Sequence, residues 1–420
     1  MFRRSPIVIP SEPGPPASPV SARRGRGARD LLLVFTFHLS RLSSAGGLLT
    51  LALVFPFGAL SQSGSSSPSA ALSLEQQSNF SAAADVWRTH LKSNPRDPAA
   101  WASLGVDLSR LQQYSEAAAA YRKALALDPK LPGIQLNLGL AEFKQNNLDA
   151  AIPPLRAALA VDPKNSQART LLGLSCYGAG KFSEAVKHLS AASAADPTNA
   201  ELHNVLAQSC LSAKNFECAK NEFAWILKNT PESAASHMLL GQALDGLSQT
   251  NAAIAEFEAA AKSDPHEPNV YFGLGYLYWK LRRNDEAAQA LERELENDPK
   301  NAQALAYLGD VELKRQNSDR ALTLIKQALA IRSELRIAQL DLGVLLTQQG
   351  QYPEALAALK RAEQLDPAQP EVHYRLGRVY QALGDKETAR KEFARVQQLH
   401  QKTEEDVSVK LSGGKPQSNP

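Results

Sequence analysis

The sequence predicts an all-α fold, a solenoid of antiparallel helix pairs, on two observations. From Pro98 the chain repeats nine times at a period of 34 residues, with leucine at the seventh position of each repeat and alanine at the twentieth. A fixed period of this length is typical of arrays in which each unit stacks on its neighbours. A small residue also recurs at position eight, and we expect it to face the alanine so that the two helices approach closely.

Each repeat carries the pattern of two helices joined by a turn. In the first repeat, Trp101, Leu104 and Leu108 lie at the spacing of one helix face, and Ala117 and Tyr121 begin a second such face. The turn between them favours a left-handed backbone where glycine or asparagine stands at position 15. Those residues are Asn146, Gly180, Gly350 and Gly384. Proline at position 32 closes the second helix in most repeats, because proline cannot continue a helix.

These positions resemble the tetratricopeptide repeat family. The stretch from Trp101 to Pro129 matches almost the whole pattern of that family, and the resemblance covers nine repeats over residues 98–403. It implies a right-handed superhelix whose inner, concave face holds peptides or protein segments. No cofactor is implied.

Both ends of the array carry their own predictions. Residues 70–97 keep part of one more repeat, and we interpret Leu72 to Lys92 as a helical N-terminal cap that covers the first repeat. Residues 62–69 are rich in serine and glycine and are expected to form a flexible linker. Residues 404–420 are expected to be a disordered tail.

Residues 1–61 form an arginine- and proline-rich leader with two apolar runs, Leu31 to Phe37 and Leu48 to Leu60. The second run, about 13 residues long, is shorter than the roughly 20 residues of a spanning helix but suits a secretory signal. We therefore predict export after cleavage, to the periplasm or the exterior. A membrane anchor formed by residues 31–60 and a cytosolic chain are the alternatives.

Charge argues against a nucleic-acid partner. The chain has 46 basic and 43 acidic residues, but the leader holds seven arginines against Glu12 and Asp30, so 39 basic and 41 acidic residues remain. Binding to nucleic acid requires a clustered basic face, which a nearly neutral array does not provide.

The repeats leave no segment for a separate catalytic domain, so we predict a non-enzymatic protein. His203, His237 and His373 all occupy position four, where a bulky, partly buried ring is expected. No carboxylate or cysteine recurs beside them at ligand spacing, so no metal site is predicted.

Three cysteines allow one disulfide. Cys176 and Cys210 occupy equivalent positions of successive repeats and are expected to lie too far apart to pair. Cys210 and Cys218 flank one hairpin turn, and an oxidising compartment could join them. Packing as small buried side chains is the favoured alternative for these residues.

Positions 2, 5, 9, 12 and 13 of each repeat, which the family resemblance places on the inner face, are the expected binding surface. Repeat six is exceptional there, because Phe272, Tyr276 and Trp279 lie within about 60° on one helix face. Aromatic rings beside polar groups are the usual composition of a binding hot spot. The full set of candidates is Phe272, Tyr276, Trp279, Tyr307, Asp310, Met238, Gln242, Asn204, Gln208, Tyr374, Arg375 and Arg378.

We therefore predict a scaffold that binds an extended segment of another protein and assembles or positions a complex. The leading alternative is an accessory subunit that binds a glycan or another polymer by stacking on the rings of repeat six. A further alternative for Trp279 and Tyr307 is simple packing between adjacent first helices.

Overall fold

The computed structural model describes residues 67–411, and the side chains of residues 67–405. The predicted leader, its two apolar runs and most of the linker lie outside these residues. Every regular element in the described part is an α-helix, which confirms the all-α prediction. Among the described helices, none has both the length and the apolar character needed to cross a bilayer.

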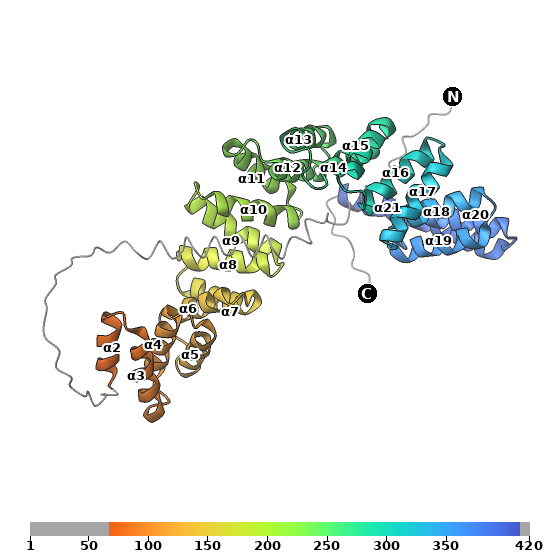
Figure 1. The fold of residues 1–420 in the computed structure, drawn as a ribbon. Coiled ribbons are helices and arrows are strands. Elements are labelled where there is room, and N and C mark those ends of the chain that lie inside the picture. The colour runs from red at the N-terminus through yellow and green to blue at the C-terminus, as the bar shows by residue number, and fades with distance from the viewer. Residues whose placement is uncertain (1–66, 412–420) are drawn as a thin grey trace. The chain divides into compact units, whose positions relative to one another are not determined.

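The described chain forms two compact units, divided between Asn229 and Thr230. Figure 1 shows consecutive helices of each unit lying side by side in antiparallel pairs. The first unit contains α2 (Pro68–Gln76), α3 (Phe80–Ser93), α4 (Pro98–Arg110), α5 (Tyr114–Leu127), α6 (Ile134–Lys144), α7 (Leu148–Val161), α8 (Ser166–Gly178), α9 (Phe182–Ala195), α10 (Ala200–Ser212) and α11 (Phe216–Asn229). The second contains α12 (Ala234–Gly246), α13 (Thr250–Ser263), α14 (Val270–Lys280), α15 (Asn284–Asn297), α16 (Ala302–Lys314), α17 (Ser318–Ile331), α18 (Arg336–Gln348), α19 (Tyr352–Leu365), α20 (Pro370–Ala382) and α21 (Lys386–Leu411).

The turn inside each pair has one backbone conformation whatever its residue. The four residues predicted to be left-handed have positive φ, and the residue at position 15 of all the remaining repeats has positive φ as well. The nine residues are Gln112, Asn146, Gly180, Lys214, Ser248, Arg282, Gln316, Gly350 and Gly384. Helix pairing therefore sets this turn even where the residue pays a steric cost in the left-handed region.

Position eight makes a closer contact in addition to the one predicted. The alanines at position 20 are buried, but the nearest side chain to a Cβ built on the glycine at position eight belongs to position 24. A Cβ on Gly275 would lie 2.6 Å from Leu291 Cγ, and one on Gly105 would lie 2.5 Å from the ring of Tyr121. The missing side chain makes room for this large neighbour. In three repeats the backbone carbonyl of the alanine at position 20 also lies within 3.5 Å of the built Cβ, so the expected approach to that alanine is present as well.

The N-terminal cap is more complete than predicted. Two helices, α2 and α3, replace the single span from Leu72 to Lys92, and Ser78 between them has the same positive φ as the turns of the repeats. Helix α2 begins at Pro68, inside the predicted linker, because the Ser67 side chain accepts a hydrogen bond from the backbone N–H of Ala70 and caps it. At the other end, α21 continues to Leu411, so residues 404–411 are helical where a disordered tail was expected.

A carboxyl group is buried next to this cap. Asp107 of α4 has no exposed surface, and neither of its oxygens has a hydrogen-bond partner among the described residues. Burial raises the pKa of Asp107 to about 7, and the charge of Glu75 on α2 adds to the shift. The equivalent position in later repeats carries an uncharged residue, which is serine at Ser175 and Ser209 and apolar in the others, as in Leu277 and Val311.

We expect Gly275→Leu to destabilise the second unit by about 1 to 3 kcal/mol, because the new side chain overlaps Leu291. Ala255→Leu, at an exposed position within α13, is the matched control and is expected to change stability little. The measurement is urea unfolding followed by circular dichroism. Equal unfolding midpoints for the two variants would contradict the proposed contact.

Asp107 gives stability a defined pH dependence. Its folded pKa of about 7 lies above the unfolded value of 3.8, so the folded state favours the protonated carboxyl. The stability linked to this group is therefore fully present below pH 3.8 and is lost as pH rises toward 7. We expect Asp107→Asn to weaken this dependence, as measured by urea unfolding at pH 5 and pH 8. The exposed Asp285→Asn serves as control; an unchanged pH dependence in Asp107→Asn would refute the assignment.

Candidate functional site

The first helix of repeat six begins late, and a side chain from its partner helix holds its start. Helix α14 begins at Val270, after Asn269 in a left-handed conformation that makes no side-chain cap. The buried carboxylate of Glu294 on α15 accepts a hydrogen bond from the backbone N–H of Phe272 at 3.1 Å. Asn301 donates to the same carboxylate at 2.9 Å. Burial raises the pKa of Glu294, and these hydrogen bonds oppose the shift.

Four rings from α14 and α16 pack together, and we call Phe272, Tyr276, Trp279 and Tyr307 the ring cluster. Tyr307 stands edge-on to Trp279, with ring centroids 4.9 Å apart, and edge-on to Tyr276 at 5.6 Å. Its ring also lies 5.8 Å from that of Phe272. Edge-to-face pairs of this kind stabilise a cluster beyond the burial of their area.

Packing within the ring cluster limits how much of each predicted ring is accessible to a ligand. Phe272 is 5% exposed and Tyr276 is 8% exposed, so these two rings belong mainly to the core. Trp279 and Tyr307 are half-buried. The alternative of packing between adjacent first helices describes Trp279 and Tyr307, whose rings lie 4.9 Å apart between α14 and α16. Both rings nevertheless keep part of their surface accessible.

Asp310 ties the cluster to a charged group. The indole N–H of Trp279 donates to Asp310 Oδ2 at 2.5 Å, and Lys314 Nζ lies 2.6 Å from the same oxygen. The ammonium of Lys314 also lies 4.9 Å from the centroid of the Trp279 ring. Carboxylate and indole face thus hold one cation between them, as in cation–π sites.

One functional candidate was missed by the sequence analysis. Asp341 of α18 is 5% exposed, and its Oδ2 has no hydrogen-bond partner among the described residues. Burial raises its pKa well above the ordinary value, and the neighbouring charge of Asp310 contributes next. Only its place at position six, one step from the predicted inner positions, gave a signal in the sequence.

The remaining predicted residues do not gather at this cluster. Met238 is buried in α12, and Gln242 is half-buried on the same helix. In the first unit, Gln208 donates to Asn204 at 2.9 Å and accepts from the Tyr177 hydroxyl at 2.6 Å, so these groups satisfy one another.

Helix α20 carries the last three predicted residues. Tyr374 is 39% exposed, and Arg378 is also exposed. Arg375 binds Glu371 on the same helix at 2.7 Å, and its guanidinium lies 5.7 Å from the Tyr374 ring. This surface is a smaller mixed patch of its own.

The histidines at position four have carboxylate partners, contrary to the prediction. Nδ1 of His203 lies 2.6 Å from Glu222, and the same arrangement, 19 residues apart, recurs in two other repeats as His237 with Glu256 and His373 with Glu392. Sequence reasoning missed the pair because it joins the two helices of a repeat rather than one helix face.

A third carboxylate lies near one of these pairs. The ligand atoms of Glu363, His373 and Glu392 lie within 4.8 Å of one another, a spacing that a metal ion could use. The same His–Glu pair occurs at His203 and His237, where no such group is formed among the described residues. We therefore interpret the pair as a structural link between helices.

The cysteines form one bridge. Cys210 and Cys218 are joined by a disulfide across the turn from α10 to α11, with Cα atoms 5.7 Å apart. The favoured packing role is therefore wrong for this pair. Cys176 is free and buried, and burial raises the pKa of its thiol to about 12, which keeps it protonated.

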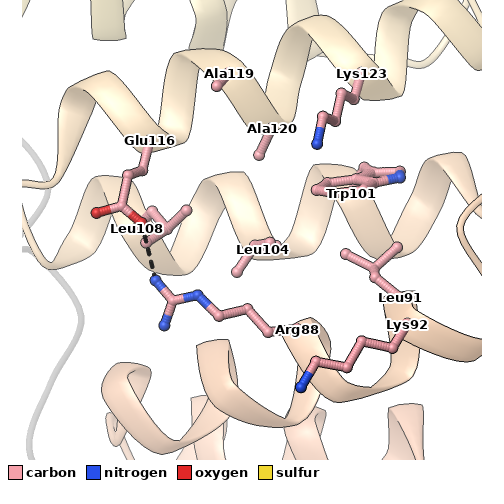
Figure 2. Close-up of a pocket in the computed structure, with 10 residues that line it drawn as sticks. All are labelled: Arg88, Leu91, Lys92, Trp101, Leu104, Leu108, Glu116, Ala119, Ala120 and Lys123. Atoms are coloured by element: carbon pink, nitrogen blue, oxygen red, sulfur yellow. Dashed lines mark hydrogen bonds and ion pairs between the residues drawn. The ribbon is translucent and has the colours of Figure 1, made fainter.

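A pocket of about 340 Å³ lies between α3, α4 and α5 in the first unit. Figure 2 shows Arg88 of α3 reaching Glu116 of α5, an ion pair of 3.1 Å. Lys123 lies 4.1 Å from the centroid of the Trp101 ring. With leucine and alanine side chains also lining it and three basic residues against one acidic, this pocket suits an apolar group that bears a negative charge.

Family models of tetratricopeptide repeats match most of the chain. The model described as the cytochrome c-type biogenesis protein H TPR domain matches residues 58–193. Models described as tetratricopeptide repeat match residues 177–243, 240–302, 272–336 and 371–403, and one described as TPR repeat matches 343–384. No curated protein matches the chain significantly.

Solved structures share the helical-repeat character at low identity. The Cut9–Hcn1 hetero-tetramer of the APC/C is 14% identical over 79% of each chain, with a TM-score of 0.47. Yeast Tom70 is 15% identical over 81% of this chain and 92% of its own, with a TM-score of 0.39. PilF of Pseudomonas aeruginosa is 21% identical over 48% of this chain and 91% of its own, with a TM-score of 0.44.

On its repeat pattern, helix pairs and family matches, the chain belongs to the tetratricopeptide repeat family.

Proposed function

We propose that the chain is a non-enzymatic scaffold whose first helices bind an extended segment of another protein. Tetratricopeptide arrays generally serve protein interaction, and the observation that carries the proposal is the juxtaposition of Trp279, Tyr307 and Asp310 on α14 and α16. Fixed aromatic rings beside a buried carboxylate have the composition of a protein-binding hot spot. The rings of Trp279 and Tyr307 and the carboxylate of Asp310 are already in contact with one another or with Lys314, an arrangement that supports binding.

The arrangement of the rings favours a protein segment over a glycan. Sugar rings stack on an open aromatic face, but Tyr307 stands edge-on to Trp279 and the Lys314 ammonium lies over the indole. The accessible surface of Trp279 therefore lies beside a cation and a carboxylate, a setting that suits a charged side chain of a protein segment better than a sugar ring. We do not propose the polymer-binding alternative further.

We also propose that the chain is exported, with possible retention at the membrane through residues 31–60 as the alternative outcome. The disulfide between Cys210 and Cys218 supports export, because such bonds persist in oxidising compartments and are rare in the cytosol. The apolar run from Leu48 to Leu60 supports it independently.

Site-specific photocrosslinking tests the scaffold proposal. A photoreactive phenylalanine analogue at Trp279 is expected to capture a partner in the native cell, and the same analogue at Ala255, exposed on the second helix α13, is the control. Trp279→Ala is expected to reduce recovery of that partner. Tyr276→Ala is a poorer test, because the buried ring contributes to folding. Equal capture from both positions would overturn the assignment of the binding face.

The export proposal makes a chemical prediction. In protein taken from the native cell without reductant, denaturation and alkylation are expected to modify Cys176 alone, and reduction is expected to expose all three thiols. Cys218→Ser is expected to lower stability by about 2 to 3 kcal/mol, measured by urea unfolding. Three alkylated cysteines before reduction would contradict export to an oxidising compartment.

A further inference from the structure

Two buried carboxyl groups lie on neighbouring helices, Asp310 on α16 and Asp341 on α18, and these helices contact one another. Asp310 is buried on α16, and Asp341 is 5% exposed on α18, where the charge of Asp310 is the strongest electrostatic influence on it. Neighbouring carboxyl groups repel one another when both are ionised, so the charge of Asp310 disfavours an ionised Asp341. A buried oxygen without a hydrogen bond, such as Asp341 Oδ2, also carries an uncompensated desolvation cost.

Nearby cations offset only part of the cost of burying Asp341. Lys314, Arg336 and Arg375 all act on the charge of Asp341, but none of the hydrogen bonds described above reaches its Oδ2. Arg375 is engaged with Glu371 at 2.7 Å, and Arg336 lies 3.8 Å from Asp366. Asp341 Oδ2 therefore remains an acceptor without a hydrogen-bond donor, even though cations lie in its neighbourhood.

Lys314 shows what this place can bind. Its exposed side chain reaches back one helical turn to set its ammonium 2.6 Å from Asp310 and 4.9 Å from the centre of the Trp279 ring. Because the Lys314 side chain is exposed, its contacts with Asp310 and the Trp279 ring are weak enough for another cation to replace them. Lys314 thus occupies one half of a receptor for a positively charged group.

We propose that Asp310, Asp341 and the face of Trp279 form a receptor for one arginine or lysine side chain of the bound segment, and that Lys314 holds its place in the free protein. This inference rests on the proposed function, since it names the chemistry that the segment carries. The incoming cation displaces Lys314 from the indole, binds Asp310 and gives Asp341 Oδ2 its missing donor.

Arginine fits this receptor better than lysine. A guanidinium is planar and offers several N–H donors in a fixed fork, so one group can donate to two carboxylates while its flat face lies on an aromatic ring. An ammonium is a compact charge that can satisfy both carboxylates only from one point between them. We therefore expect a preference for arginine.

The test begins with peptides of random sequence displayed against the full chain. An enriched peptide is then synthesised with its basic residue intact and with citrulline, the neutral isostere of arginine, in its place. Binding constants are measured by fluorescence polarisation to the wild type, Asp341→Asn, Lys314→Ala and the exposed control Asp285→Asn. Thermal unfolding of each variant confirms that it is folded.

We expect enriched peptides to share a basic residue, and citrulline or Asp341→Asn to weaken binding at least about tenfold. Lys314→Ala is expected to strengthen binding several-fold, and Asp285→Asn to leave it unchanged. The citrulline comparison requires no variant protein, so it decides the matter even if Asp341→Asn fails to fold.

Other outcomes distinguish failure of the proposed receptor from failure of the proposed scaffold function. Enriched peptides that lack a basic residue, or that bind equally well with citrulline, would overturn the receptor while leaving the scaffold in place. Failure to enrich any peptide would count against both. Weaker binding to Lys314→Ala would show that Lys314 is itself a contact and would refute its role as a place-holder.

Discussion

The fold depends on the contact between the missing side chain at position eight and the large side chain at position 24. A glycine in the first helix lets a ring or a leucine of the second helix lie against its backbone, as Gly105 does with Tyr121 and Gly275 with Leu291. Close packing of this kind leaves little freedom in the angle between the two helices. The uniform left-handed turn at position 15 follows, because one helix pairing imposes one backbone path on glycine and lysine alike.

A second contact joins six of the nine repeats to the element before them. The side chain at position four donates to the backbone carbonyl six residues upstream, which belongs to the end of the preceding repeat. This bond occurs at Trp101, Arg169, His203, His237, Gln339 and His373. Four residue types share the role because each offers an N–H at a similar reach. The accepting carbonyl is that of the proline or serine that follows the second helix.

The period of the sequence predicted the helix pairs, their register and the buried alanines, because these features repeat and reinforce one another. It did not predict contacts formed once. The carboxylate of Glu294 holds the start of α14 through the backbone N–H of Phe272, a contact found once and not repeated with the period. Asp341 gave no periodic signal, because a buried carboxyl is defined by neighbours on another helix. Phe272 was placed on the open face, but Tyr307 of the next first helix covers it.

These single contacts explain why repeat six differs in more than composition. The late start of α14 and its hold by Glu294 fix the backbone at Phe272, and the rings then pack from that point toward Asp310. A surface built this way is ordered before a ligand arrives, so binding costs less conformational entropy than ordering a loose set of side chains. Rigid rings alone attract many partners weakly. The buried carboxyl of Asp341 has no hydrogen-bond donor at one oxygen. A partner that brings a donor to this oxygen is therefore favoured over one that does not.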